Sequence, residues 1–307
     1  MRQKRLPVGF SVLFAVLAGL AAYLVAGRLM NSETRNTGTE LKTARKPRIV
    51  SMAPASTSIL VSLGVSDALV AVDTWSGEIH GVPADAVRFD MMKPDAERLA
   101  ALEPDILIVS AITQAGTSKD PFKPLEEAGV RVLYLPTSTS IEEIRADVRR
   151  IAELSGRAEA GTELIAQMDS GIERIAKVAR TIPGNERRSV VFEISPAPTI
   201  YSFGSGVYLD ELLETAGAVN ALGKESGWIA VSAEAVMAAD PDVILTNASF
   251  GEDPVAEIRS RPGWSHLKAV RTGRVFYIDN AASSQPAPGV VTALGEIAKA
   301  VYPEYFR

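Results

Sequence analysis

Apolar and polar positions in this chain follow a pattern that occurs twice, at an offset of 137 residues. Residues 96–105 carry apolar side chains at helical spacing and end in an acidic-Pro-Asp turn, after which residues 106–108 are branched and apolar. Residues 233–242 and 243–245 repeat this order. Such a pattern indicates an amphipathic helix that leads into a buried strand. The repeat therefore predicts a similar α/β unit in each of two lobes.

Two further pairs of short apolar runs correspond more loosely between the halves of the chain. Residues 48–52 match residues 189–193, and residues 130–134 match residues 274–278. Short runs of branched apolar residues bounded by turn residues are typical of strands. Each half is therefore expected to hold several strands of a buried sheet.

The segment between the two copies has a helical pattern. From residue 141 to residue 180, apolar side chains recur at intervals of three and four, and charged residues occupy the other positions. This spacing predicts a long amphipathic helix. Ser155-Gly156 is a candidate kink, and Pro183-Gly184-Asn185 is expected to end the helix before the second lobe.

The N-terminal region reads as an export signal. Basic residues precede twenty uncharged, mainly apolar residues from Val8 to Gly27, and Arg28 follows. Twenty helical residues span about 30 Å, the thickness of a bilayer core, whereas the apolar part of a signal peptide has about 7–15 residues. The length favours an uncleaved anchor with the rest of the chain outside the cytoplasm, and cleavage after Gly27 is the alternative.

These patterns predict an α/β protein with two Rossmann-like lobes joined by a long α-helix, preceded by an N-terminal transmembrane or signal segment. The polar residues before the first lobe cannot bury enough surface to fold, so they are expected to form a tether. The expected segments are a signal or transmembrane anchor (1–30), a flexible linker (31–47), an N-terminal α/β lobe (48–140), a linking helix (141–182) and a C-terminal α/β lobe (183–307).

Charge and composition exclude several classes of function. The first 47 residues hold 8 Lys and Arg and 2 Asp and Glu, which leaves 24 basic and 35 acidic residues, a net charge of −11, for the rest. An acidic body repels nucleic acid, so no nucleic-acid partner is expected. Cysteine is absent, which removes disulfides, thiolate metal sites and a lipid-attachment cysteine. His80 and His266 are the only histidines, too few for a bare-metal site.

Three segments carry a family resemblance that extends from residue 48 to the C-terminus. Residues 48–64, 208–220 and 261–275 are similar, in order and spacing, to segments of the helical-backbone (class III) periplasmic binding proteins, which serve importers of ferric siderophores, haem and vitamin B12. The chain departs from the family pattern at Ser58, where Glu is common. It also departs at residues 89–93, which replace a glycine-containing segment.

The resemblance implies the substrate-binding subunit of an ABC importer on the extracytoplasmic face of the membrane, with no enzyme activity and no cofactor of its own. The ligand, an iron-siderophore, haem or cobalamin type that brings its own chelated iron or cobalt, would lie between the lobes. The partner would be a permease dimer with its ATPase subunits. Glu97 and Glu234 match the family's permease-docking glutamates, although acidic residues are also common in first helical turns.

Four aromatic residues are candidate ligand contacts. Trp75, Trp228, Tyr201 and Phe203 lie in or near loops that follow predicted strands, where open α/β sheets place ligands. Packing in the lobe cores is the alternative for all four, and it is the expected role of Trp264.

Two other functions stay open. A membrane-tethered ligand sensor would have the same sequence features as an import subunit. A membrane-anchored enzyme on a doubly wound scaffold is less well supported, because the phosphate-binding, serine-hydrolase and dinucleotide-binding motifs are missing.

Overall fold

The computed structural model describes residues 45–111, 120–249 and 252–306. The predicted anchor, including residues 8–27, and nearly all of the predicted linker lie outside the described residues. The chain divides into Met1–Lys46 and one compact unit, Pro47–Arg307, which holds both lobes. Within the described residues, no helix combines the length and apolar character needed to cross a bilayer.

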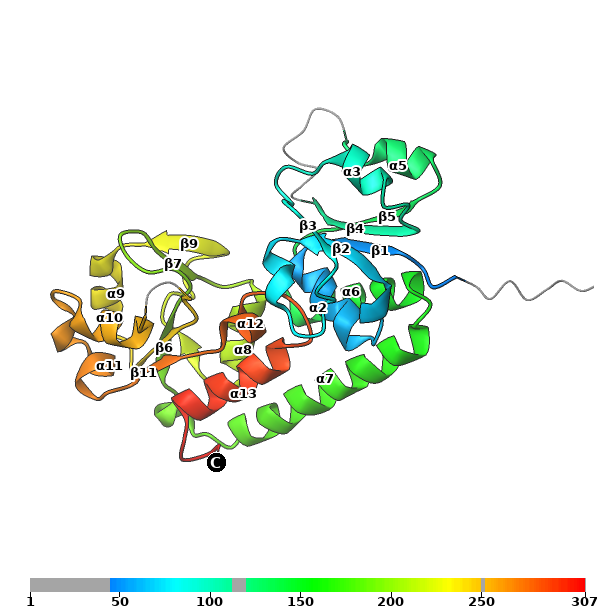
Figure 1. The fold of residues 1–307 in the computed structure, drawn as a ribbon. Coiled ribbons are helices and arrows are strands. Elements are labelled where there is room, and N and C mark those ends of the chain that lie inside the picture. Colours follow the sequence, from blue (N-terminus) through cyan, green and yellow to red (C-terminus); the bar gives the residue numbers. More distant parts are fainter. Residues whose placement is uncertain (1–44, 112–119, 250–251, 307) are drawn as a thin grey trace, which may run out of the picture. The chain divides into compact units, whose positions relative to one another are not determined.

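The N-terminal lobe is built on a sheet of five parallel strands in the order β3-β2-β1-β4-β5 (Figure 1). The strands are β1 (Ile49–Met52), β2 (Leu69–Asp73), β3 (Val87–Phe89), β4 (Ile106–Ser110) and β5 (Arg131–Leu135). The strands predicted at residues 48–52, 106–108 and 130–134 are all present, as β1, β4 and β5, which confirms the prediction of an α/β lobe.

Both faces of this sheet are covered by helices. They are α2 (Pro54–Ser62), α3 (Ala96–Ala100), α5 (Lys123–Glu127) and α6 (Ile141–Leu154). Ile49 and Ile106 belong to one apolar cluster with α2 and α6, whereas Val50 and Leu107 belong to another with α3 and α5. Successive strand residues point to opposite faces, so a strand buried on both sides must be apolar throughout.

The C-terminal lobe repeats this design with a sheet of four parallel strands in the order β11-β10-β6-β8. The strands are β6 (Ser189–Glu193), β8 (Val219–Asn220), β10 (Val243–Thr246) and β11 (Val275–Tyr277), and a separate antiparallel pair joins β7 (Ile200–Phe203) to β9 (Trp228–Val231). The helices are α8 (Tyr208–Thr215), α9 (Ala233–Ala239), α10 (Pro254–Ser260), α11 (Lys268–Arg271), α12 (Asn280–Ser283) and α13 (Val290–Val301).

The two copies of the internal repeat make equivalent hydrogen bonds. A carboxylate oxygen of Asp105 accepts from the backbone N–H of Arg48, just before β1, at 2.7 Å. The equivalent Asp242 accepts from the backbone N–H of Ser189, at the start of β6, at 2.9 Å. The acidic residue two positions before each aspartate has a positive φ, +44° in the first copy and +38° in the second. The acidic-Pro-Asp turn thus ends a helix and joins two neighbouring strands.

The predicted linking helix is two helices. After α6, the chain breaks at Ser155-Gly156, where Gly156 has a φ of +71°, and α7 then runs from Ala158 to Ala179. A residue with positive φ cannot continue a right-handed helix, so the candidate kink is a full break. Of the two, α7 is the long connecting helix; it packs against α6 in the first lobe and α8 and α13 in the second (Figure 1).

Two glycines allow α7 to pack closely against both lobes. Gly161 lies against Ala152 of α6, and Gly171 lies against Val291 of α13, with too little space for a Cβ atom at either position. One apolar cluster also contains buried residues from both lobes. The two lobes therefore share a continuous core along α7.

Candidate functional site

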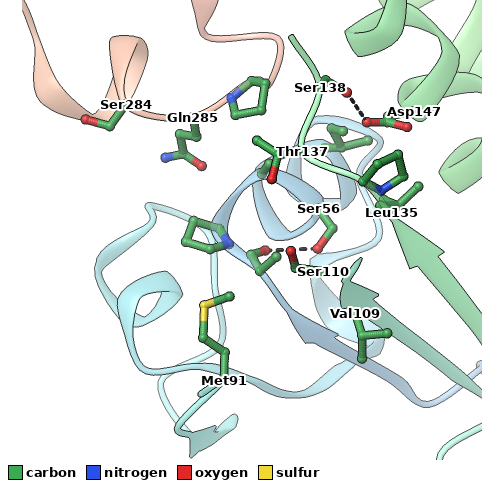
Figure 2. A pocket seen from close by; sticks show the side chains of 16 residues that line it. Ser56, Met91, Val109, Ser110, Leu135, Thr137, Ser138, Asp147, Ser284 and Gln285 are labelled. Carbon is green, nitrogen blue, oxygen red and sulfur yellow. Dashed lines mark hydrogen bonds between the residues drawn. The ribbon is translucent and has the colours of Figure 1, made fainter. Parts of the chain in front are cut away.

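A cavity of about 180 Å³ lies where three parallel strands of the N-terminal lobe end (Figure 2). It is lined by residues 53–56 after β1, residues 109–110 at the end of β4, and residues 135–138, which begin at the last residue of β5. The chain leaves β1 in one direction to form β2 and returns on the other side of β1 as β4. Open α/β sheets bind ligands at such a reversal of strand order.

The C-terminal lobe closes this cavity. Ser284, Gln285 and Pro286 line it directly after α12. The hydroxyl of Ser58, on α2, donates to Oε1 of Gln285 at 2.8 Å. Ser58, which departs from the family pattern, is thus part of a polar contact between the lobes, and the cavity lies at their junction.

The wall of the cavity is mainly apolar and is formed in part by core residues. Ile59, Val109 and Leu135 are buried, and Met91, which follows β3, adds a thioether. Hydroxyl and amide groups supply most of the polar surface: Ser56, Ser110, Thr137, Ser138, Ser284 and Gln285. Apolar walls with a few placed polar groups are typical of small-molecule sites.

One acidic side chain lines the cavity. Asp147, on α6, is only 6% exposed. Its Oδ2 atom accepts from the hydroxyl of Ser138 at 2.5 Å, and its Oδ1 atom lies 3.6 Å from Nη1 of Arg150. Burial raises the pKa of Asp147, while the Ser138 hydrogen bond and the Arg150 charge act in the opposite direction.

Trp75 lies at the same edge of the sheet as the cavity, because it follows the carboxyl end of β2. It opens a short 3-10 helix, Trp75–Glu78 (η2), and its side chain is 73% exposed. Buried Asp73 fixes this turn: Oδ1 accepts from the backbone N–H groups of Trp75 at 2.9 Å and of Ser76 at 3.1 Å. The turn therefore holds an exposed indole on a rigid support, outside the cavity wall itself.

The other three aromatic candidates lie on one face of the β7–β9 pair. Phe203 is opposite Trp228 and Tyr201 is opposite Ala230, and directly opposed side chains point to the same face. Trp228 and Tyr201 are 45% and 48% exposed, but Phe203 is 1% exposed. The expectation that Phe203 contacts a ligand is therefore corrected: it is a core residue.

Phe203 supports Trp228 instead. The two rings meet edge to face at 6.0 Å, and Tyr208 makes a similar contact with Trp228 at 5.9 Å. The hydroxyl of Tyr208 donates to the backbone carbonyl of Ser283 at 2.7 Å. A chain of contacts thus leads from Trp228 to the loop that closes the cavity.

Glu97 and Glu234 occupy equivalent and exposed positions in the first turns of α3 and α9. The side chains of Asp95 and Ser232 cap these helices by accepting from backbone N–H groups at 3.0 and 3.1 Å. Hydrogen bonds from its own backbone N–H and from Ser232 lower the pKa of Glu234. Neither glutamate is among the residues that line the cavity.

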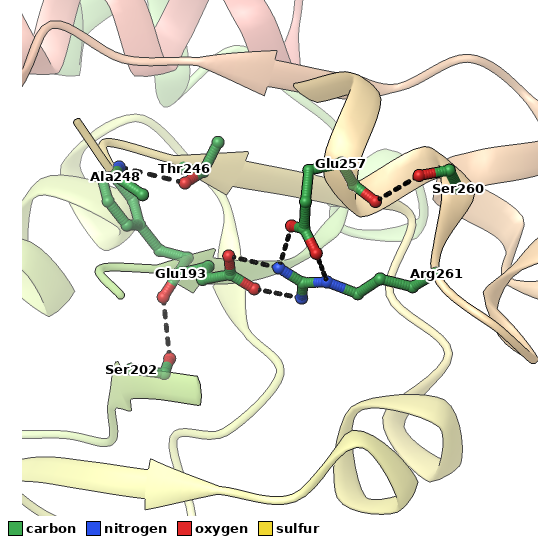
Figure 3. A network of polar contacts seen from close by, with 8 residues as sticks. Glu193, Ser202, Thr246, Ala248, Glu257, Ser260 and Arg261 are labelled. Atoms are coloured by element: carbon green, nitrogen blue, oxygen red, sulfur yellow. Dashed lines mark hydrogen bonds and ion pairs between the residues drawn. The ribbon is translucent and has the colours of Figure 1, made fainter. Parts of the chain in front are cut away.

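A buried ionic network in the C-terminal lobe has no counterpart among the predicted sites (Figure 3). Glu193, the last residue of β6, accepts two hydrogen bonds from the guanidinium of Arg261, at 2.5 and 2.8 Å. Glu257 on α10 also binds this guanidinium, which lies over the ring of Trp264 at 4.6 Å. Trp264 is 1% exposed, which confirms its expected packing role.

No group of three or more potential metal ligands occurs within the part of the chain that the structure describes. The polar side chains that line the cavity carry hydroxyl groups, one amide and one carboxylate. These groups suit hydrogen bonding to an organic ligand better than coordination of a bare metal ion.

Comparisons with known proteins agree on the kind of molecule. A family model described as periplasmic binding protein matches residues 49–282. An uncharacterized ABC transporter substrate-binding lipoprotein, YvrC of Bacillus subtilis, is 30% identical over 263 residues, which cover 85% of this chain and 81% of that protein. The Fe(3+)-citrate-binding protein YfmC of the same organism is 22% identical over 76% of this chain and 73% of its own length. A cobalamin-binding protein of Halobacterium salinarum is 24% identical, covering 83% and 69%.

Solved structures show the same fold. A possible iron-binding (periplasmic solute-binding) protein of Staphylococcus epidermidis superposes with a TM-score of 0.72, at 25% identity, over 84% of this chain and all (100%) of that chain. The periplasmic heme-binding protein RhuT of Roseiflexus gives a TM-score of 0.71 at 23% identity, over 84% of this chain and 98% of that chain.

Proposed function

This chain belongs to the periplasmic binding protein family, and we propose that it is the substrate-binding subunit of an ABC importer on the extracytoplasmic face of the membrane. It captures an iron-siderophore, haem or cobalamin-type ligand and delivers it to a permease dimer with its ATPase subunits. The observation that carries this proposal is the cavity at the junction of the lobes, at the reversal of strand order. The names of the relatives support the same range of ligands.

The size of the cavity bears on how such a ligand binds. Its volume of about 180 Å³ is smaller than the roughly 300–1,000 Å³ of pockets that enclose drug-sized molecules. A chelate or corrinoid therefore either extends beyond the cavity or enters after the lobes have moved apart. The continuous core along α7 keeps such movement small, because separating the lobes exposes apolar surface.

Trp75 and Trp228, with Tyr201, provide the stacking surfaces in this proposal. The side chains of Trp75 and Trp228 are exposed but held from behind, one by the Asp73 turn and the other by two aromatic rings. Such rigid aromatic faces lose little entropy on binding, and each contact contributes about 0.5–1.5 kcal/mol beyond burial.

Ligand capture is tested by titrating the purified protein with cyanocobalamin, haem and ferric siderophores while following tryptophan emission. Trp75→Ala and Trp228→Ala should each weaken ligand binding by at least roughly 2-fold, because the ring contact alone contributes about 0.5–1.5 kcal/mol and the buried area of the indole is lost as well. Trp264→Phe, which removes the buried indole, is the control and should leave the affinity unchanged. A lack of any saturable response would contradict ligand capture, and unchanged affinity in both alanine variants would exclude these indoles as contacts.

Docking to the permease is assigned to Glu97 and Glu234, one on each lobe. Both are exposed, so replacing either should change stability by no more than about 0.5 kcal/mol. A charged side chain that becomes buried in an interface matters more for binding than for stability: removing one partner of such a charge pair costs about 2–5 kcal/mol of binding free energy. We expect the double Glu→Arg variant to abolish uptake in cells while ligand affinity in solution stays normal. Glu163→Arg, an exposed charge reversal on α7, is the control; normal uptake by the double variant would refute the assignment.

The N-terminal anchor is a separate part of the proposal. Retention of Val8–Gly27 in the mature protein would tether the binding unit to the membrane, as the length of the apolar run suggests. Mass spectrometry of the protein isolated from its native membrane decides this point. A mature N-terminus near Arg28 would show instead that the segment is a cleaved signal peptide.

A further inference from the structure

The segment that closes the cavity from the side of the C-terminal lobe, residues 284–286, starts from a rigid support (Figure 2). Ser283, the last residue of α12, is fully buried. Its backbone carbonyl accepts from the hydroxyl of Tyr208 on α8 at 2.7 Å. Its Oγ atom accepts from the side-chain amide of Asn247, directly after β10, at 3.0 Å. Hydrogen bonds from two other elements of the lobe therefore fix the base of this closing segment.

The side chain of Asn247 is oriented by this support and not by its own pairing. The hydroxyl of Ser283 donates to the backbone carbonyl of Asp279 at 2.6 Å, so its only proton is used and Asn247 must present its NH2 group. Within the described part of the chain, Oδ1 of this fully buried amide has no protein partner. A buried unpaired carbonyl is costly, so the fold holds the base of the closing segment at the expense of pairing at Asn247.

The tip of the closing segment is also restricted. Gln285 is followed by Pro286, and Pro288 lies two residues further on, so the backbone has little freedom there. The side-chain NH2 group of Gln285 donates to the backbone carbonyl of Ala281, on α12, at 3.2 Å. The amide of Gln285 is therefore part of the C-terminal lobe and moves with it.

The other partner of Gln285 belongs to the N-terminal lobe. The hydroxyl of Ser58 donates to Oε1 of Gln285 at 2.8 Å. Ser58 lies in the middle of α2, and its neighbours Thr57 and Ile59 are buried in that lobe. A contact longer than about 3.5 Å is no longer a hydrogen bond, so separating the lobes by roughly 1 Å along this bond breaks it. The bond exists in the closed arrangement and is lost on opening.

A second hydrogen bond between the lobes lies away from the cavity. The backbone N–H of Ile141, the first residue of α6, donates to Oε2 of Glu211 on α8 at 2.8 Å. Neither residue lines the cavity, whereas Gln285 does. The Ser58–Gln285 bond is therefore placed to respond when a ligand enters.

We infer that Ser58 and Gln285 form a latch, whose hydrogen bond stabilises the closed arrangement of the lobes and opens before a ligand enters the cavity. The cavity of about 180 Å³ cannot enclose a chelate or corrinoid unless the lobes first move apart. One neutral hydrogen bond shifts such an opening equilibrium by roughly 2- to 10-fold. This inference rests on the proposed function, because it assumes that the cavity is the ligand site.

The latch is tested first without a ligand. The chain has no cysteine, so spin labels can be attached at Glu127→Cys and Thr272→Cys, which are exposed positions of the N-terminal and C-terminal lobes. In this labelled protein, Ser58→Ala should add a population with a changed label-to-label distance in double electron–electron resonance. Ser62→Ala is the matched control and should leave the distances unchanged, because Ser62 is exposed on the same helix and donates within it, to the carbonyl of Ser58.

The second measurement follows ligand entry by stopped-flow tryptophan emission, with cyanocobalamin, haem and ferric citrate as probes. The association rate of a probe that binds should rise by roughly 2- to 10-fold in Ser58→Ala, because more molecules are open, and should be unchanged in Ser62→Ala. In a Gln285→Ala background the latch is already lost, so Ser58→Ala should change the rate by less than about 2-fold.

Unchanged distances or an unchanged association rate in Ser58→Ala would overturn the inference. An equal rise in rate with and without Gln285 would also overturn it, since Ser58 would then act through another contact. If Ser58→Ala changes the distances but no probe binds, the hydrogen bond between the lobes stands, whereas its role in ligand entry fails together with the proposed function. The two failures are therefore distinguishable.

Discussion

The contact between α7 and α13 makes a sharp prediction about how the two lobes are held. Gly171 faces Val291, and an ideal Cβ atom added to Gly171 would lie 2.5 Å from Cγ1 of Val291. Val291 is β-branched and has little rotamer freedom in a helix, so the helices themselves must shift. Overpacking of this kind costs about 1–3 kcal/mol, whereas replacing a helical Gly by Ala gains about 0.5–1 kcal/mol. Gly171→Ala should therefore destabilise the protein by up to about 2.5 kcal/mol.

Gly295 on α13 is the matched control. It is also helical, but its nearest neighbour, Cδ1 of Ile175, would be 3.9 Å from an added Cβ atom, an ordinary contact. Gly295→Ala should raise the free energy of unfolding by about 0.5–1 kcal/mol. Urea unfolding followed by circular dichroism gives both values from the midpoint and the slope.

The two substitutions are chemically identical, so their difference reports the packing of α7 alone. If Gly171→Ala is as stable as Gly295→Ala, then α7 and α13 do not approach as closely as the structure shows. A second variant checks the cause: Val291→Ala should recover part of the loss in the Gly171→Ala background, a coupling that distant sites would not show.

Two further predictions concern buried charges. Arg261→Leu leaves Glu193 buried without its partner and should lower the free energy of unfolding by about 3–5 kcal/mol in chemical denaturation. Adding Glu193→Gln should recover most of that loss, because the unpaired charge is removed. Equal stability of the single and double variants would contradict this explanation. Burial raises the pKa of Asp147 above its unfolded value of about 3.9. Ionised Asp147 therefore lowers the free energy of unfolding as pH rises through its folded-state pKa. In urea unfolding between about pH 3.5 and pH 7, Asp147→Asn should become more stable relative to the unmodified protein as pH rises. A difference in the free energy of unfolding that stays constant over this range would refute the shift.

The two lobes could be predicted from the sequence because the residues that form each local turn and strand are also the residues that the packed sheet requires. Asp105 and Asp242 end equivalent turns and bind the backbone at the start of a neighbouring strand, so the same short motif is needed twice. Apolar runs such as 106–110 mark strands covered on both faces. The resemblance to periplasmic binding proteins is confirmed by the family match over residues 49–282.

Aromatic residues were harder to place, because exposure depends on neighbours distant in the sequence. Tyr201 and Phe203 have the same strand parity, and nothing local distinguishes them. Phe203 is buried because Trp228, from the partner strand, and Phe192 pack against it. Which of two equivalent aromatic side chains faces solvent is thus decided by the register of β7 with β9.

The cavity residues were missed because serine, threonine and alanine form no motif. Their position, however, was a usable signal, since residues 53–56 and 135–138 directly follow predicted strands. Asp147 also carried a signal. It lies three residues after Ile144 and next to Val148, on the apolar side of an amphipathic helix, where an acidic residue is not expected.

Two acidic residues of this protein are almost equally buried, and their partners determine what each can do. Glu193 has both oxygens bound by the guanidinium of Arg261, which is in turn held by Glu257 and Trp264, so the charge is compensated within the protein. Asp147 has one hydrogen bond, from a neutral hydroxyl, and a longer contact with a largely hydrated arginine. A buried carboxyl group is costly unless its acceptors are satisfied. Of these two buried charges, that of Asp147 is therefore the less well compensated, so removing it should cost the fold less than removing either partner of the Glu193–Arg261 pair.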